Sequence, residues 1–312
     1  IASWTASAGT TTGYKIAWAN GSEAPVNCDL GNIIDAGNVT TLPITGIASG
    51  SLVAVRVCSY EDSNFPSAGV SILAQVQSTT WHQTAFIKAG NAAVNDRFGE
   101  QVKISGDTLA VSAIYEDSNQ LTITNGTASS ANNTLVDSGA VYIYKKTAGL
   151  WAQEAYVKAA NAGSNDGFAE RISLDGDTLV VAAKHEDSNQ NSITNGATAN
   201  ADNTLADSGA VYVYKRTGST WAQEAFIKAS NAEGEDTFGY DVAMSGNLLI
   251  VGATHEDSTY GSIIHGTTSS SDNTERNSGA AYVYRRSGST WVQEAYIKPQ
   301  FAYANERFGS GV

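Results

Sequence analysis

The sequence predicts an all-β protein in which one four-stranded antiparallel sheet is repeated along the chain. Three observations favour this fold class. Tryptophans recur every 70 residues, short segments alternate apolar and polar side chains, and Gly, Asn and Asp separate those segments. The segments that follow the tryptophans align without a gap, and none of them shows a helical period. The recurring tryptophans are Trp81, Trp151, Trp221 and Trp291.

The second repeat shows the order of elements. Its four expected strands, rich in Val, Ile, Tyr and Trp, are residues 151–158, 171–174, 178–183 and 210–215. A tight turn at residues 175–177 joins the second and third strands, and its Gly and Asp are typical of a hairpin. A long polar loop, residues 185–209, separates the third strand from the last.

Sheets of this kind bury their faces only against neighbouring sheets, and radial stacking around an axis provides those neighbours. We therefore expect the blades of a β-propeller, with a linear array of small β-sandwiches as the alternative. The expected repeats are residues 81–150, 151–220 and 221–290, with a partial repeat at 291–312. The expected blades are Phe98–Lys158, Phe168–Lys228 and Phe238–Lys298, so each blade includes the tryptophan-led strand that opens the next repeat, and this strand should be outermost. Three blades cannot close a ring, so we expect a partial arc, with residues 81–88 as the outer strand of a final blade.

Composition excludes several classes of partner. Charged residues make up only 16% of the chain, and 18 Lys and Arg against 31 Asp and Glu give a net charge of −13. Such a chain repels nucleic acid and anionic lipid. Its apolar runs are far shorter than the ~20 residues of a membrane-spanning helix. The chain begins at Ile1 and ends inside a recurring motif, so we expect a fragment of a larger surface or secreted protein.

A recurring pair of motifs marks the repeats. Phe98-Gly99, Phe238-Gly239 and Phe308-Gly309 recur in register, and each full repeat also contains Ser-Gly-Ala followed by Val or Ala and then Tyr. Residues 81–312 thereby resemble the FG-GAP repeats of integrin α-subunit propellers, and more closely those of bacterial cell-surface proteins. The resemblance implies an extracellular adhesion or recognition module. The chain departs from the pattern at Ala169, which replaces the glycine of Phe-Gly.

Residues 1–73 do not share the 70-residue period. Trp4 and the segments 14–18, 42–47 and 53–58 resemble strands of a fibronectin type III domain. The resemblance implies a small β-sandwich whose first strand is missing. Val53 stands where that family often has the tyrosine of its corner motif. Residues 74–80 are then a short linker.

The two cysteines, Cys28 and Cys58, both lie in this first segment. A pair confined to one small domain favours a disulfide and an oxidising compartment, extracellular or at the cell surface. Two free, buried thiols are the alternative.

Repeated carboxylates are the main candidate site. The expected ligand-binding face collects acidic residues of the long loops: Glu116, Asp117, Asp137, Glu186, Asp187, Asp207, Glu256 and Asp257. Calcium is the one cofactor considered, with Asp96, Asp117, Asp166, Asp187, Asp236 and Asp257 as ligands, since carboxylate oxygens suit this ion. The alternative is a structural role in turns and loop-anchoring hydrogen bonds. The hairpin turns themselves are too short to wrap calcium.

Three functions remain open. The first is a non-catalytic adhesion or recognition module whose partner is a cell-surface protein, a glycan or other copies of an extracellular assembly. The second is a structural spacer or filament component. The third is an enzyme. No residue stands out as a unique catalytic acid, base or nucleophile, so we expect no enzymatic activity. Variation among the long loops favours recognition over the spacer.

Overall fold

The computed structural model describes residues 2–6, 11–48, 50–61, 67–75, 83–259 and 261–312. The chain divides into two compact units, Ile1–Thr84 and Ala85–Val312. The described residues form strands and loops but no helix, so none of them belongs to a helix long and apolar enough to cross a bilayer. The predicted all-β class is confirmed.

The first unit contains a four-stranded antiparallel sheet and a two-stranded one. The larger sheet has the order β3-β2-β5-β6 and consists of β3 (Asn32–Gly37), β2 (Gly13–Asn20), β5 (Leu52–Tyr60) and β6 (Val70–Gln75). The smaller sheet pairs β1 (Ala2–Ser3) with β4 (Thr41–Leu42). Trp4 packs with Ile16, Val53 and Val55 in the core between them. The predicted disulfide between Cys28 and Cys58 is present, and both cysteines are fully buried.

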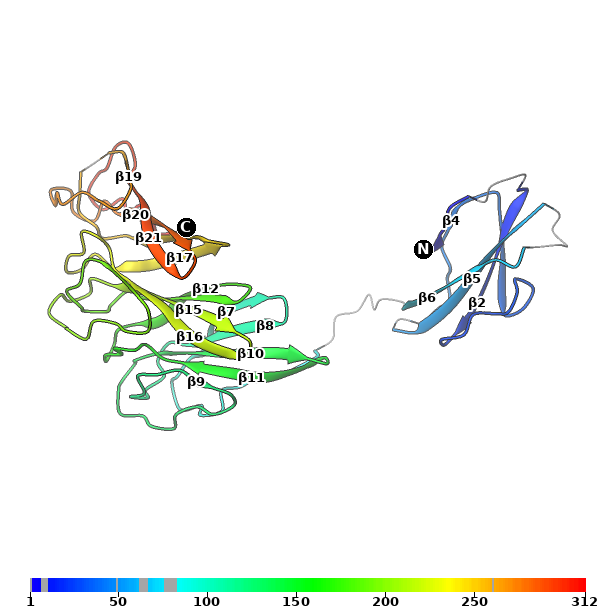
Figure 1. Ribbon diagram of the computed structural model, residues 1–312, viewed down its shortest axis with the longest axis horizontal. Helices are drawn as coiled ribbons and strands as arrows, with labels where there is room; N and C mark the ends of the chain where they lie inside the picture. The colour runs from blue at the N-terminus through cyan, green and yellow to red at the C-terminus, as the bar shows by residue number, and fades with distance from the viewer. Residues whose placement is uncertain (1, 7–10, 49, 62–66, 76–82, 260) are drawn as a thin grey trace. The chain divides into compact units, whose positions relative to one another are not determined.

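The second unit contains three five-stranded antiparallel sheets, one for each expected blade (Figure 1). The first has the order β7-β8-β10-β11-β9, and the other two repeat that order. Its strands are β7 (Phe98–Ser105), β8 (Thr108–Ala113), β9 (Thr124–Asn125), β10 (Ala140–Thr147) and β11 (Leu150–Val157). The second sheet consists of β12 (Phe168–Asp175), β13 (Thr178–Ala183), β14 (Ile193–Asn195), β15 (Ala210–Thr217) and β16 (Thr220–Ile227). The third consists of β17 (Phe238–Ser245), β18 (Leu248–Ala253), β19 (Ile263–His265), β20 (Ala280–Ser287) and β21 (Thr290–Ile297).

The tryptophan-led strand is not outermost, which corrects the prediction. In each sheet part of the long polar loop returns and pairs with the outer edge of that strand, as β9 does with β11 and β14 with β16. An exposed edge presents unpaired N–H and C=O groups, and this short strand covers them.

Residues 81–88 were predicted to form an outer strand of a final blade. Residues 81 and 82 lie outside the described residues, and residues 83–88 form no strand.

The three sheets pack face to face in sequence. β12 lies beside both β7 and β17, so the first strands of the repeats are neighbours. Between the first two sheets, aliphatic side chains such as Val141 and Ile143 meet aromatic ones such as Phe168 and Tyr212. The second interface repeats this arrangement, with Val211 and Val213 against aromatic side chains of the third sheet. Each sheet therefore has one aliphatic and one aromatic face.

The two sequence motifs meet where neighbouring sheets touch. Gly209, in Ser-Gly-Ala of the second repeat, has a φ of +78°, and a Cβ there would lie 2.1 Å from the carbonyl oxygen of Phe238. The Phe238 amide in turn donates to the Ser208 carbonyl at 3.2 Å. Gly139 approaches Phe168 in the same way, and Gly279 approaches Phe308. Glycine is thus required because the backbone of the next repeat occupies the space of a side chain.

Ala169 keeps the backbone of the glycine that it replaces. Its φ is +73°, against +101° at Gly99 and +92° at Gly239. The Phe-Gly position therefore lies in the left-handed region in all three repeats, and an alanine there is strained.

Candidate functional site

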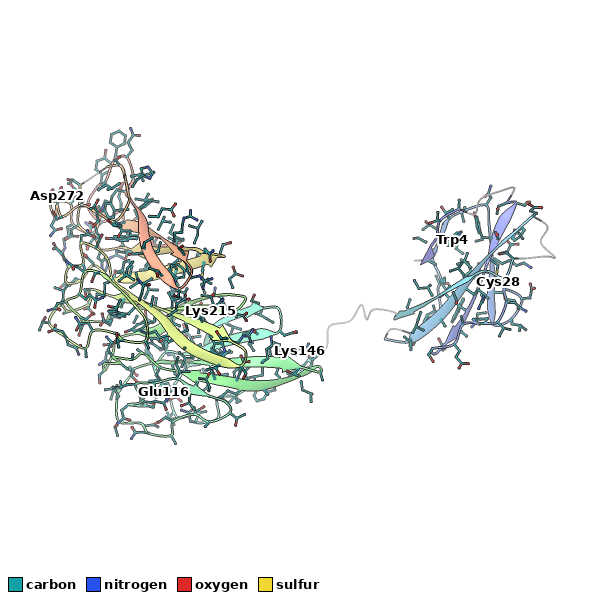
Figure 2. All side chains as sticks on the ribbon, viewed as in Figure 1. Trp4, Cys28, Glu116, Lys146, Lys215 and Asp272 are labelled. Atoms are coloured by element: carbon teal, nitrogen blue, oxygen red, sulfur yellow. A yellow bond between two sulfur atoms is a disulfide. The ribbon has the colours of Figure 1, made fainter. Side chains whose placement is uncertain are left out.

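The long loops and the loops that precede each first strand emerge together at one end of the sheets, which we call the loop end. Backbone hydrogen bonds join the two kinds of loop, as from the Asn165 amide to the Val136 carbonyl and from Glu235 to Ala206. The tight hairpin turns lie at the opposite end. In Figure 2 Glu116 and Asp272 mark the loop end of the first and third repeats, and Lys146 lies near the hairpin end.

Each long loop begins with a buried ion pair. In the second repeat Glu186 is 1% exposed, and its carboxylate lies 2.7 Å from the ammonium of Lys228, at the end of the tryptophan-led strand. The ammonium also donates to the Ser208 hydroxyl at 2.7 Å, where the loop ends. The pair therefore holds the start and the end of the loop against the sheet.

Two more side chains complete this arrangement. Asn161 donates from its amide to the other oxygen of Glu186 at 2.8 Å, and Tyr212 donates to the Asn161 carbonyl oxygen at 2.6 Å. We call these five side chains, Glu, Lys, Ser, Asn and Tyr, the loop anchor. It recurs at the first sheet as Glu116, Lys158, Ser138, Asn91 and Tyr142 and at the third sheet as Glu256, Lys298, Ser278, Asn231 and Tyr282.

Burial sets the electrostatics of the anchor. Removal from water lowers the pKa of the Lys158 and Lys228 ammonium groups, whereas the adjacent glutamates oppose that change. A buried ion pair is maintained only where its geometry and further hydrogen bonds offset the loss of hydration. Every anchor meets this condition through its serine and asparagine.

The loop anchor takes the three glutamates out of the predicted ligand-binding face. Glu116, Glu186 and Glu256 were expected at an exposed surface, but each is 1% exposed and bound to a lysine. They are not accessible to a macromolecular partner. A charged residue at the start of a polar loop is usually solvated, and the sequence alone does not show that its partner lies 42 residues further on.

The aspartates that follow these glutamates are half-buried and shape the loops. Asp187 accepts a hydrogen bond from the Asp207 amide at 2.8 Å, and Asp207 has a φ of +53°. Asp117 binds the Asp137 amide in the same way, and Asp257 binds the amide of residue 277. Asp207 also contacts His185 Nδ1 at 2.7 Å. The five aspartates of the predicted ligand-binding face are therefore all partly exposed, and Asp137 and Asp207 lie where the long loops end.

A third set of carboxylates is buried under the loops. Asp96, Asp166 and Asp236 are 4–5% exposed, and each accepts a hydrogen bond from the backbone amide three residues before it. Burial, followed by nearby carboxylates such as Glu186 and Glu256, raises the pKa of Asp166 to about 7 and that of Asp236 to about 8. Burial also raises the pKa of Asp96.

These carboxylates do not fit a calcium ion. Calcium needs six to eight oxygen ligands at one point. In the part of the chain that the structure describes, no three acidic, histidine or cysteine side chains gather in a group that could hold a metal. Each candidate aspartate binds a backbone amide instead, and the cation beside each glutamate is a lysine. The calcium prediction has no support from this geometry.

The anchor lysine, serine and asparagine were missed in the sequence analysis. A signal for them is present: Lys158, Lys228 and Lys298 recur at 70-residue spacing directly after an apolar run. A lysine repeated at the end of buried strands indicates a buried acidic partner.

The model of the FG-GAP repeat matches residues 81–144, 151–198 and 221–284, more than half of the chain. No curated protein matches the chain. Each matched segment begins at a tryptophan and continues through the Phe-Gly position into the first strands of one sheet. The first and third segments also contain the Ser-Gly-Ala motif, whose glycine contacts the next repeat. The chain belongs to the FG-GAP repeat family.

Proposed function

We propose that this chain is a non-catalytic recognition or adhesion module of an extracellular or cell-surface protein. In this proposal the three sheets are blades of an incomplete β-propeller, and the first unit is a fibronectin type III-like sandwich. FG-GAP repeats are typical of extracellular or adhesion-type modules, which supports the proposal. The disulfide in the first unit agrees with an oxidising compartment.

An uncovered sheet face supports the propeller. Ile172 and Val242 occupy equivalent positions in the second and third repeats and are 2% and 6% exposed, because a preceding sheet covers them. Their counterpart Val102 is 54% exposed, as is expected of a sheet without that neighbour. Further repeats would bury this face.

The observation that carries the recognition proposal is the contrast between anchors and loop surfaces. All three anchors use the same five residue types, whereas exposed loop positions differ, for example Val136, Ala206 and Arg276. A fixed base with a variable surface is the arrangement that ligand recognition needs. A spacer needs no such variation.

A loop exchange tests this proposal. Because the repeats align without gaps, residues 262–276 can be replaced by residues 192–206 while Gly261 and the third anchor are kept. We expect the fluorescently labelled protein to bind surfaces in a panel of bacterial, fungal and animal cells, and the exchange to weaken that binding at unchanged thermal stability.

The matched control exchanges a hairpin turn at the opposite end. Residues 245–248 are replaced by residues 175–178, and this variant should bind as the original protein does. If the original protein binds no cell, or if both exchanges bind equally well, the recognition proposal is wrong and the spacer function is favoured.

A further inference from the structure

Two adjoining hollows lie at the loop end between the second and third repeats. Their volumes are about 370 Å³ and about 280 Å³, and they share Asn191, Ser230 and Thr267. Together they fall in the size range of small-molecule sites in proteins. We call the two hollows the junction pocket.

The junction pocket is lined mainly by neutral polar groups. Within the described part of the chain, the side chains of Asn191, Thr267 and Ser271 make no hydrogen bond, so their polar atoms remain available. The Ser230 hydroxyl is held in place by Ser269 Oγ at 2.7 Å and by Gln293 Oε1 at 2.9 Å. Donors and acceptors therefore face the same space.

The charged groups of the pocket already have partners. Lys228 lines one hollow, but its ammonium binds Glu186 within the loop anchor. The Glu233 carboxylate accepts a hydrogen bond from the Asn273 amide. Lys228 is therefore not available to an acidic ligand, whereas Glu233 is exposed and keeps its negative charge, which repels such a ligand.

The residues at the preceding junction show which polar groups of the pocket are not required for folding. The equivalent positions, 70 residues earlier, lie between the first and second repeats, where the backbone arrangement is the same. There Asn191, Ser230, Thr267, Ser269 and Ser271 correspond to Leu121, Ala160, Ala197, Ala199 and Ala201. The repeat folds with alanine at four of these positions, so the hydroxyls at the second junction are not required for packing.

We propose that the junction pocket binds a neutral saccharide; this inference rests on the proposed recognition function and names its ligand class. Sugar hydroxyls both donate and accept hydrogen bonds, as do the hydroxyl and carboxamide groups of the pocket. The smaller hollow adds apolar surface from Ile193 and Val292, which suits the C–H face of a pyranose ring. An acidic ligand would find no free cation there, and a basic ligand would find only the exposed Glu233 carboxylate.

The test begins with an array of neutral, acidic and sulfated glycans. We expect the protein to bind neutral saccharides, and titration calorimetry then measures the affinity for the best of them. The variant Ser230→Ala/Thr267→Ala/Ser269→Ala introduces the residues of the preceding junction, so the fold should be preserved. Affinity should fall at least about tenfold, since several hydrogen bonds are lost. The control Thr127→Ala, at the position equivalent to Thr267 in the first repeat, should bind as the original protein does.

Two results would overturn the inference: no neutral saccharide binds, or the triple variant binds as tightly as the original protein. The cell-binding experiment distinguishes this failure from failure of the proposed function. If the protein binds cells but no saccharide, only the saccharide proposal is wrong. If it binds a saccharide but no cell, the proposed adhesion function is wrong.

Discussion

At the scale of single residues, the buried carboxylates link stability to pH. Asp166 and Asp236 have pKa values of about 7 and about 8 in the folded chain, above the ordinary value of 3.8, because burial disfavours their charged form. The folded protein therefore binds protons that the unfolded chain has released. Stability from these groups is complete below the ordinary pKa and is lost as pH rises through 7 to 8.

We expect the second unit to unfold at a lower temperature at pH 8.5 than at pH 5. The variant Asp236→Asn keeps an acceptor for the Glu233 amide and removes the titrating group, so the difference between the two pH values should shrink. Thermal unfolding followed by circular dichroism measures both. An unchanged difference in the variant would show that Asp236 does not carry the pH dependence.

The same residues show why the site was only partly predictable. Repetition of Glu186 and Asp187 identified them as important, and loop anchoring by hydrogen bonds was one of the interpretations considered. Their burial was not visible, since Lys228 and Asn161 approach from other parts of the chain. The Cys28–Cys58 disulfide was predictable because only one pairing exists.

At the scale of elements, the predicted strands of each repeat follow from alternation and from the Gly and Asp turns. The fifth strands, β9, β14 and β19, have only two or three residues in polar loops, and so short a segment carries no periodic signal. Pairing with the tryptophan-led strand, rather than local propensity, determines them.

The glycine contacts between sheets give a prediction at this scale. Gly209→Ala places a methyl group against the backbone of Phe238, so either the sheets separate or the turn distorts, and we expect a loss above about 3 kcal/mol. Gly176 also has a positive φ, +55°, but its Cβ position is open, so Gly176→Ala should cost only about 1 kcal/mol. Urea unfolding compares them, and equal losses would contradict a role for Gly209 in joining the sheets.

At the scale of the second unit, the sheets pack against their neighbours in sequence, as the contacts of β12 with β7 and β17 show. Stability in such arrays is close to a sum of repeat and interface contributions, so a defect in one anchor should act mainly on its own loop. Lys228→Met removes the cation of the second anchor and leaves Glu186 buried without its partner, while the first and third anchors stay intact. If only the second loop responds to this variant, the effect comes from loop anchoring and not from a loss of overall stability.

Amide hydrogen exchange measures most directly whether the long loops are held in fixed geometry. The Gly139, Gly209 and Gly279 amides donate to the carbonyls of the three anchor glutamates at 2.8–2.9 Å. We expect these amides to exchange as slowly as those of the adjacent strands, and Lys228→Met to accelerate Gly209 far more than Gly139 or Gly279. Rapid exchange at all three glycines of the original protein would contradict anchored loops, and with them the fixed base on which recognition depends.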